Sequence, residues 1–92
     1  MLLYLELKIF IRSSNSLKDK RQVVHSIKDR LKSRYNLSVS ELNSDNKWQT
    51  ATLGIAYVGQ DGKDMERMKR NIEENIYLNG NAEILSVKEE IL

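Results

Sequence analysis

The chain has 92 residues, which is enough for one domain with one hydrophobic core. Hydrophobic residues make up 40% of it and charged residues 30%, a balance typical of folded globular proteins and not of disordered chains. It contains no cysteine, so disulfides, thiolate metal sites and thiol nucleophiles are excluded. We therefore expect residues 1–92 to form a single domain.

The 15 basic and 13 acidic residues are unevenly distributed along the chain. Residues 1–59 carry ten Lys or Arg and five Asp or Glu, whereas residues 60–92 carry five and eight. This asymmetry favours an anionic partner for the first part of the chain.

The apolar start of the chain raises the question of a signal peptide. It lacks a basic first segment and a small-residue cleavage site, and it is interrupted by Glu6 and Lys8, so we expect no secretion. No apolar run reaches the length of about 18 residues that a membrane helix needs. We expect a cytoplasmic protein without membrane contact.

The first predicted element is a long strand. Residues 2–12 alternate with period two, so one face of the strand is apolar and the other is mixed. The apolar face, which we expect in the core, carries Leu3, Leu5, Leu7, Ile9 and Ile11.

A helix is predicted next, from Leu17 to about Asn36. Ser16 is typical of a helix N-cap, and Asp19 stands three residues later, where a capping box has an acidic residue. On a helix of this register the apolar residues form one stripe. The stripe contains Leu17, Val24, Ile27, Leu31 and Tyr35, with Val23 at its edge.

Two strands joined by a polar turn follow the helix. Residues 37–42 predict a short strand, residues 43–47 a turn, and residues 48–58 a long strand rich in β-branched and aromatic side chains. Gly54 is an exception within the long strand. Its expected core face carries Ala51, Leu53, Ile55 and Tyr57.

The last two predicted elements are a helix and a strand. Residues 59–62 end the preceding strand, and residues 79–81 predict the end of the helix. Residues 82–92 predict the final strand, with Leu85 and Val87 as core positions. The apolar residues at helical spacing are Met65, Met68, Ile72 and Ile76.

The predicted order of elements is β-α-β-β-α-β, the ferredoxin-like arrangement. Two βαβ halves with right-handed crossovers give a four-stranded antiparallel sheet with both helices on one face. We therefore expect an α+β, ferredoxin-like domain.

The first predicted helix has a row of basic side chains beside its apolar stripe. The row contains Lys18, Arg21, His25, Lys28 and Lys32, at alternating spacings of three and four residues. Such a row can neutralise several phosphates of a nucleic acid, and the alternative is an ordinary solvated helix face.

Cations at the start of that helix are unfavourable with respect to the helix dipole. Lys20 stands there between Lys18 and Arg21, and a phosphate docked on the helix N-terminus would explain the cluster. Asp19 partly offsets the charge, so both interpretations stay open. The nucleic-acid-binding residues predicted from the sequence are Lys18, Lys20, Arg21, Lys28 and Lys32.

Metal binding and catalysis have no positive signal in the sequence. The chain has one histidine, His25, and its adjacent acid pairs at residues 73–74 and 89–90 diverge on a helix or strand. We expect no metal, no cofactor and no catalytic residues, and thus a non-enzymatic protein.

The sheet face away from the helices should expose aromatic side chains. Tyr4, Phe10 and Trp48 are predicted on this face, where they would stack RNA bases or be buried against a second copy of the chain. The Lys/Arg-Gly-aromatic signature of RNA-recognition sheets is missing from residues 51–58. Burial in a homodimer is therefore the preferred interpretation of these three residues.

Four motifs in the chain resemble one known family. They are Ser16–Arg21 at the start of the first helix, Ser26–Leu31 within it, Asn36–Glu41 after it and Trp48–Gly54 in the third strand. Together they resemble the YlxP-like family of small bacterial proteins, which is classed as a domain of unknown function. The resemblance spans nearly the whole chain.

The resemblance implies a ferredoxin-like domain in a cytoplasmic bacterial protein. Genes of this family often stand beside those of transcription-termination and translation-initiation factors, which suggests an RNA- or ribosome-associated role. It implies no catalytic residues. Our first hypothesis is an accessory protein that contacts RNA or the ribosome through the basic first helix, and the alternative is a homodimeric interaction module that uses the open sheet face.

Overall fold

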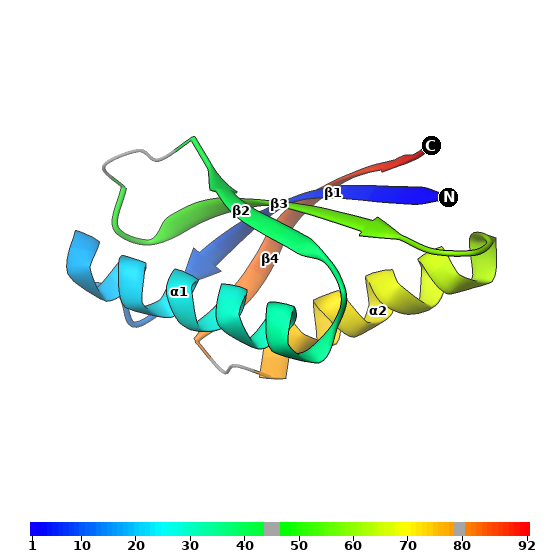
Figure 1. The fold of residues 1–92 in the computed structure, drawn as a ribbon. Helices are drawn as coiled ribbons and strands as arrows, with labels where there is room; N and C mark the ends of the chain where they lie inside the picture. Colours follow the sequence, from blue (N-terminus) through cyan, green and yellow to red (C-terminus); the bar gives the residue numbers. More distant parts are fainter. Residues whose placement is uncertain (44–46, 79–80) are drawn as a thin grey trace.

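The computed structural model describes residues 1–43, 47–78 and 81–92 (Figure 1). The predicted turn residues 44–46 and the helix-stop residues 79–80 lie outside the described residues. The element order β-α-β-β-α-β is confirmed. The elements are β1 (Leu2–Ile11), α1 (Leu17–Arg34), β2 (Ser38–Leu42), β3 (Thr50–Val58), α2 (Gly62–Leu78) and β4 (Ala82–Ile91).

The four strands form one antiparallel sheet in the order β2-β3-β1-β4. Both helices lie on the same face of this sheet, as Figure 1 shows. The ferredoxin-like α+β prediction is therefore confirmed. The strands β2 and β4 are the two edges of the sheet, and β1 lies inside it between β3 and β4.

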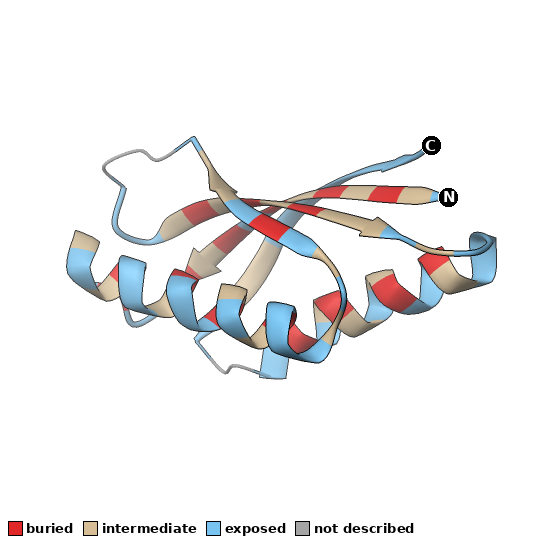
Figure 2. Ribbon diagram, in the orientation of Figure 1, coloured by how far each residue is buried: buried red, intermediate tan, exposed pale blue. Residues whose placement is uncertain are grey.

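The core lies between the sheet and the two helices (Figure 2). The five predicted core residues of β1 are at most 1% exposed, which confirms the alternation of that strand. The strand β3 adds Ala51, Leu53 and Ile55, and the helices add Val24, Ile27, Leu31, Met65, Met68, Ile72 and Ile76.

The predicted final strand is confirmed as β4, but its two predicted core positions were wrong. Leu85 is 51% exposed and Val87 39% exposed, whereas Ala82 and Ile84 contact the core. The pairing of β4 with β1 shifts register between Ile84 and Ser86, and Leu85 is the extra residue left without a partner in β1. Val87 does lie on the helix side, but β4 is an edge strand and its outer flank has no neighbouring strand.

The strand β3 begins two residues later than predicted, at Thr50. Only the carbonyl of Gln49 continues the pairing, as the acceptor for the Ile11 N–H at 2.7 Å. Trp48 therefore precedes the strand. The structure explains the glycine at position 54. The side chain of Leu42 in β2 covers it, and a Cβ atom at this position would lie 2.9 Å from Cδ1 of Leu42.

The N-terminus of α1 has the predicted cap. Ser16 has extended backbone angles, and its Oγ accepts a hydrogen bond from the Asp19 N–H at 3.1 Å. In return, a carboxylate oxygen of Asp19 accepts from the N–H of Asn15, also at 3.1 Å. This reciprocal pair ties the loop after β1 to the first turn of the helix.

The N-terminus of α2 has a similar side-chain cap, in which one carboxylate accepts more hydrogen bonds. The Asp64 N–H donates to Oδ1 of Asp61 at 2.9 Å, and the Asp64 carboxylate accepts from the Gln60 N–H at 3.0 Å. That carboxylate also accepts from the hydroxyl of Tyr57 at 3.0 Å and from Arg67 at 2.7 Å. The Gln60 N–H, followed by Tyr57 and Arg67, lowers the pKa of Asp64 although its partial burial acts in the opposite direction.

This lowered pKa predicts an acid-sensitive contribution to stability. The contribution of the Asp64 carboxylate is complete above its unfolded pKa of about 3.9 and is lost as the pH falls through the lower folded pKa. The Asp64→Asn variant should be less stable than the parent at pH 7, and the difference should shrink as the pH falls below about 4. Urea unfolding over a pH series measures this.

The control variant is Asp29→Asn, because Asp29 is exposed on α1 and should show little difference at any pH. A destabilisation by Asp64→Asn that stays constant from neutral to acid pH would contradict the assignment of the effect to the ionised carboxylate.

Candidate nucleic-acid interface on the first helix

The predicted basic row lies on one outer flank of α1. Lys18, Arg21 and Lys32 are exposed and Lys28 is half-buried. On the nearly opposite side of the helix, Arg30 donates to the carbonyl of Asn75 in α2 at 3.4 Å. The row therefore faces away from α2 and lies on the side of the β2 edge, and Figure 2 shows this side of α1 as largely exposed.

The four Lys and Arg side chains of the row, Lys18, Arg21, Lys28 and Lys32, have no partner within the part of the chain that the structure describes. The fifth member of the row, His25, lies 3.1 Å from the carboxylate of Asp29, and both are exposed. From Lys18 to Lys32 the row extends about 21 Å at the helical rise of 1.5 Å per residue. A line of unpaired cations of this length can contact several phosphates of one nucleic-acid strand.

Lys20 does not belong to this surface, and its prediction as a nucleic-acid contact is corrected. The residue is 4% exposed. Its ammonium donates to the carbonyl of Lys47 at 2.9 Å and lies 3.9 Å from a carboxylate oxygen of Glu41. Lys20 lies within the apolar stripe of the helix, so its aliphatic stem packs at the edge of the core. Its ammonium group connects α1 to Glu41 in β2 and to Lys47 in the segment before β3.

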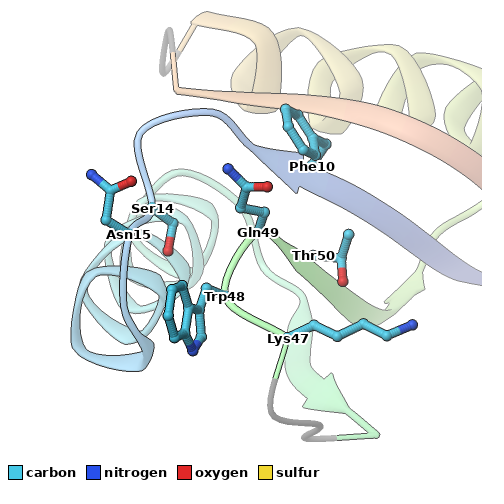
Figure 3. A pocket seen from close by; sticks show the side chains of 7 residues that line it. All are labelled: Phe10, Ser14, Asn15, Lys47, Trp48, Gln49 and Thr50. Carbon is cyan, nitrogen blue, oxygen red and sulfur yellow. The ribbon is translucent and has the colours of Figure 1, made fainter.

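The predicted interface residues fall into two separate places. Phe10 and Trp48 line one hollow of about 580 Å³, and Trp48 is 54% exposed (Figure 3). Tyr4 lines a smaller hollow of about 230 Å³ between β1, β2 and β3. Its hydroxyl donates to Glu6 at 2.9 Å, and this hydrogen bond is the main cause that raises the pKa of Tyr4.

The larger hollow adjoins the N-terminal end of α1. Besides Phe10 and Trp48, its lining includes Ser14 and Asn15, which immediately precede the cap of α1. Ser14 is 1% exposed, and its hydroxyl donates to the carbonyl of Ser16 at 3.1 Å. Figure 3 shows Trp48 on the side of Ser14 and α1, with Lys47 beside it in the chain. The sequence predicts Trp48 on the open sheet face, whereas the fold places it beside the loop that precedes α1.

Sequence reasoning missed Ser14 and Asn15 as part of this hollow. No local pattern marks them, since their position depends on how the loop after β1 meets the segment before β3. Lys20, by contrast, had a visible signal: at helical spacing it falls among Val24, Ile27 and Leu31.

Among residues 1–43, 47–78 and 81–92, no three His, Asp or Glu side chains are grouped so that they could hold a metal ion. Neither helix is long and apolar enough to cross a membrane.

The burial of Lys20 predicts a structural effect. The Lys20→Met variant keeps the apolar stem but leaves the Lys47 carbonyl and the Glu41 carboxylate without the ammonium, and should lower the free energy of unfolding by about 1–3 kcal/mol. Urea unfolding measures this. The matched variant Lys18→Met, on the exposed row, should change it by no more than about 0.5 kcal/mol. Equal effects of the two variants would contradict the distinction between them.

Comparison with known proteins gives a family and a fold. The family described as "Protein of unknown function (DUF503)" matches residues 2–89. The uncharacterized protein YlxP of Bacillus subtilis (strain 168) is 33% identical over 72 residues, which cover 74% of this chain and 78% of that protein.

Among solved structures, the de novo designed protein Foldit4 is similar with a TM-score of 0.61 and 19% identity, covering 100% of this chain and 99% of that one. At this identity the likeness supports the fold alone. The match over nearly the whole length and the relative YlxP confirm the YlxP-like resemblance of the sequence: the chain belongs to the DUF503 family of proteins of unknown function.

Proposed function

We propose that this protein is a non-enzymatic accessory factor that binds RNA, in the cytoplasm and in association with the ribosome, through the basic flank of α1. The observation that carries the proposal is the row of Lys18, Arg21, Lys28 and Lys32, which has no carboxylate partner among the described residues. On a protein surface that binds no anion, basic side chains are commonly neutralised in part by ion pairs with neighbouring carboxylates. Here the charge is left for an external polyanion.

The surroundings of the row support an anionic ligand. The half of the chain that contains α1 has the basic excess, and the acidic excess lies in residues 60–92. The Asp19 carboxylate is occupied by the Asn15 N–H at the base of the helix, and Asp29 is paired with His25. Both acids of α1 thus have partners within the protein.

Trp48 supplies a second kind of contact at the end of the row. Its exposed indole lines the hollow beside Ser14 and Asn15, next to the first turn of α1. A base that stacks on an aromatic ring adds affinity without adding charge. In the proposed complex the sugar-phosphate backbone of the RNA lies along the basic row, and an unpaired RNA base stacks on Trp48.

The open sheet face offers less to a second copy of the chain. Phe10 and Trp48 line one hollow, while Tyr4 lies in another and is hydrogen-bonded to Glu6. Two small separate apolar areas support base stacking better than they support a continuous dimer contact.

Charge reversal on the row should weaken RNA binding and reduce its salt dependence. In the triple variant Lys18→Glu, Arg21→Glu and Lys32→Glu, three phosphate contacts are lost, so the slope of log K against log salt should fall by about 2. Fluorescence anisotropy with a structured RNA over a salt series measures the slope. Glutamates at 18 and 21 lie near the positive end of the helix dipole and are favourable there, which offsets the unfavourable glutamate at 32 in the last turn, so the variant should stay folded.

The matched control reverses three basic residues that are distant from the row, Lys8, Lys63 and Arg70, and has the same net charge as the test variant. It should retain most of the affinity and slope. Equal losses in both triple variants would show that only net charge matters and would contradict the proposed site.

Trp48→Ala should separate stacking from charge. It should lower the RNA affinity by about tenfold or more, because stacking contributes about 1–3 kcal/mol per base, and leave the salt slope unchanged. The same anisotropy titrations measure it. Unaltered affinity would remove Trp48 from the interface.

A further inference from the structure

β4 is a free edge of the sheet, and it carries both exposed apolar side chains and the exposed charges of residues 88–90. Natural edge strands are commonly protected by charge, by proline or by a covering segment. Here Leu85, Val87 and Ile91 are 51%, 39% and 41% exposed along a strand of ten residues. Such an edge is suited to pair with another strand.

The hydrogen bonds at the end of β4 define which backbone groups are available. Leu92 exchanges both main-chain hydrogen bonds with Leu2, at 2.8 and 2.9 Å. In an antiparallel pair these exchanges recur at every second residue, so residues 90 and 88 also direct their N–H and C=O groups toward β1. The alternate residues point their backbone N–H and C=O groups away from β1, toward the free edge of the sheet. These residues are Val87, Glu89 and Ile91.

We propose that two copies of this chain associate by antiparallel pairing of their β4 strands over residues 86–92, with the two-fold axis at Glu89. The occupant of the edge is thus a second copy. The bulge at Leu85 interrupts the regular strand, and the paired segment is the uninterrupted part that follows it. Pairing extends the sheet to eight strands with all helices on one face.

The charges of β4 disfavour the two registers next to this one. With the axis at Glu89, Lys88 of each copy stands opposite Glu90 of the other, which gives two attractive pairs. Moving the axis to Lys88 places the two lysines opposite each other, and moving it to Glu90 does the same with two carboxylates. Like charges directly opposite destabilise a strand pair, so both neighbouring registers are disfavoured.

The apolar side chains agree with the same register. Val87 of each copy stands opposite Ile91 of the other, on the helix side of the sheet, where β4 pairs them with Leu7 and Leu3. Both are about 40% exposed in the single chain, and the partner strand would cover them. The register therefore buries apolar surface and satisfies the outward backbone groups together.

The two Glu89 residues face each other at the axis, which by itself is unfavourable. Each carboxylate, however, is 3.2 Å from the ammonium of Lys69 in α2 of its own chain. Two carboxylates and two ammonium groups form a neutral cluster around the axis. The approach of the two Glu89 side chains is therefore compatible with the proposed register.

The proposed dimer is independent of RNA binding, because β4 and β2 are opposite edges and the basic flank of α1 is on the β2 side. The test uses sedimentation equilibrium over a concentration series. The parent should approach twice the chain mass of 10.7 kDa as the concentration rises.

Charge exchange tests the register. Lys88→Glu alone and Glu90→Lys alone each convert two attractive pairs into repulsive ones, and should weaken the dimer by about tenfold. The double variant Lys88→Glu with Glu90→Lys should restore it, and the control Lys63→Glu should have no effect. A parent that stays monomeric at all concentrations, or a double variant that fails to recover, would overturn the proposal.

Amide hydrogen exchange provides a readout that needs no variant. In the single chain the N–H groups of Val87, Glu89 and Ile91 face outward and should exchange rapidly, whereas those of Lys88 and Glu90 are protected by β1. Protection of the three outward groups should rise with protein concentration in step with the dimer mass. Protection that does not change with concentration would overturn the proposed pairing.

Discussion

The burial of one face of β1 is the constraint on which the rest of the structure depends. Its five alternate side chains are at most 1% exposed, and the strand pairs with β3 on one side and β4 on the other. Because the side chains of a strand alternate with period two, the pleat of β1 decides which residues of both neighbours face the helices. Leu7, for example, aligns Leu53 and Val87 on the same side.

The same arrangement gives the two edges of the sheet different chemistry. On the β2 side, α1 presents a basic row whose Lys and Arg side chains have no partner among the described residues. A buried Lys20 joins the helix to Lys47 and Glu41. On the β4 side, exposed apolar side chains stand among charged ones, and Glu83 and Glu89 form ion pairs with Arg12 and Lys69. One edge is thus suited to a polyanion and the other to a second strand, and neither use obstructs the other.

The expected exposure of the basic residues was correct where it follows from position on one helix. Lys18, Arg21, Lys28 and Lys32 lie beside the apolar stripe, so the stripe that faces the sheet also decides that most of this row faces solvent. Lys20 was misassigned because its charge was given more weight than its place within the stripe. Leu85 was misassigned because a bulge in the pairing with β1 leaves no periodic signal in the sequence.

The sequence by itself determined the order of the elements, the core face of β1, the cap at Ser16 and the basic row on α1, since each depends on residues within a few positions of one another. Only the tertiary structure decided that Trp48 adjoins the start of α1, that Lys20 is buried and that β4 is a free edge of the sheet. These features depend on segments that are far apart in the chain. Local periodicity cannot encode such contacts, because they arise only when the sheet and helices pack together.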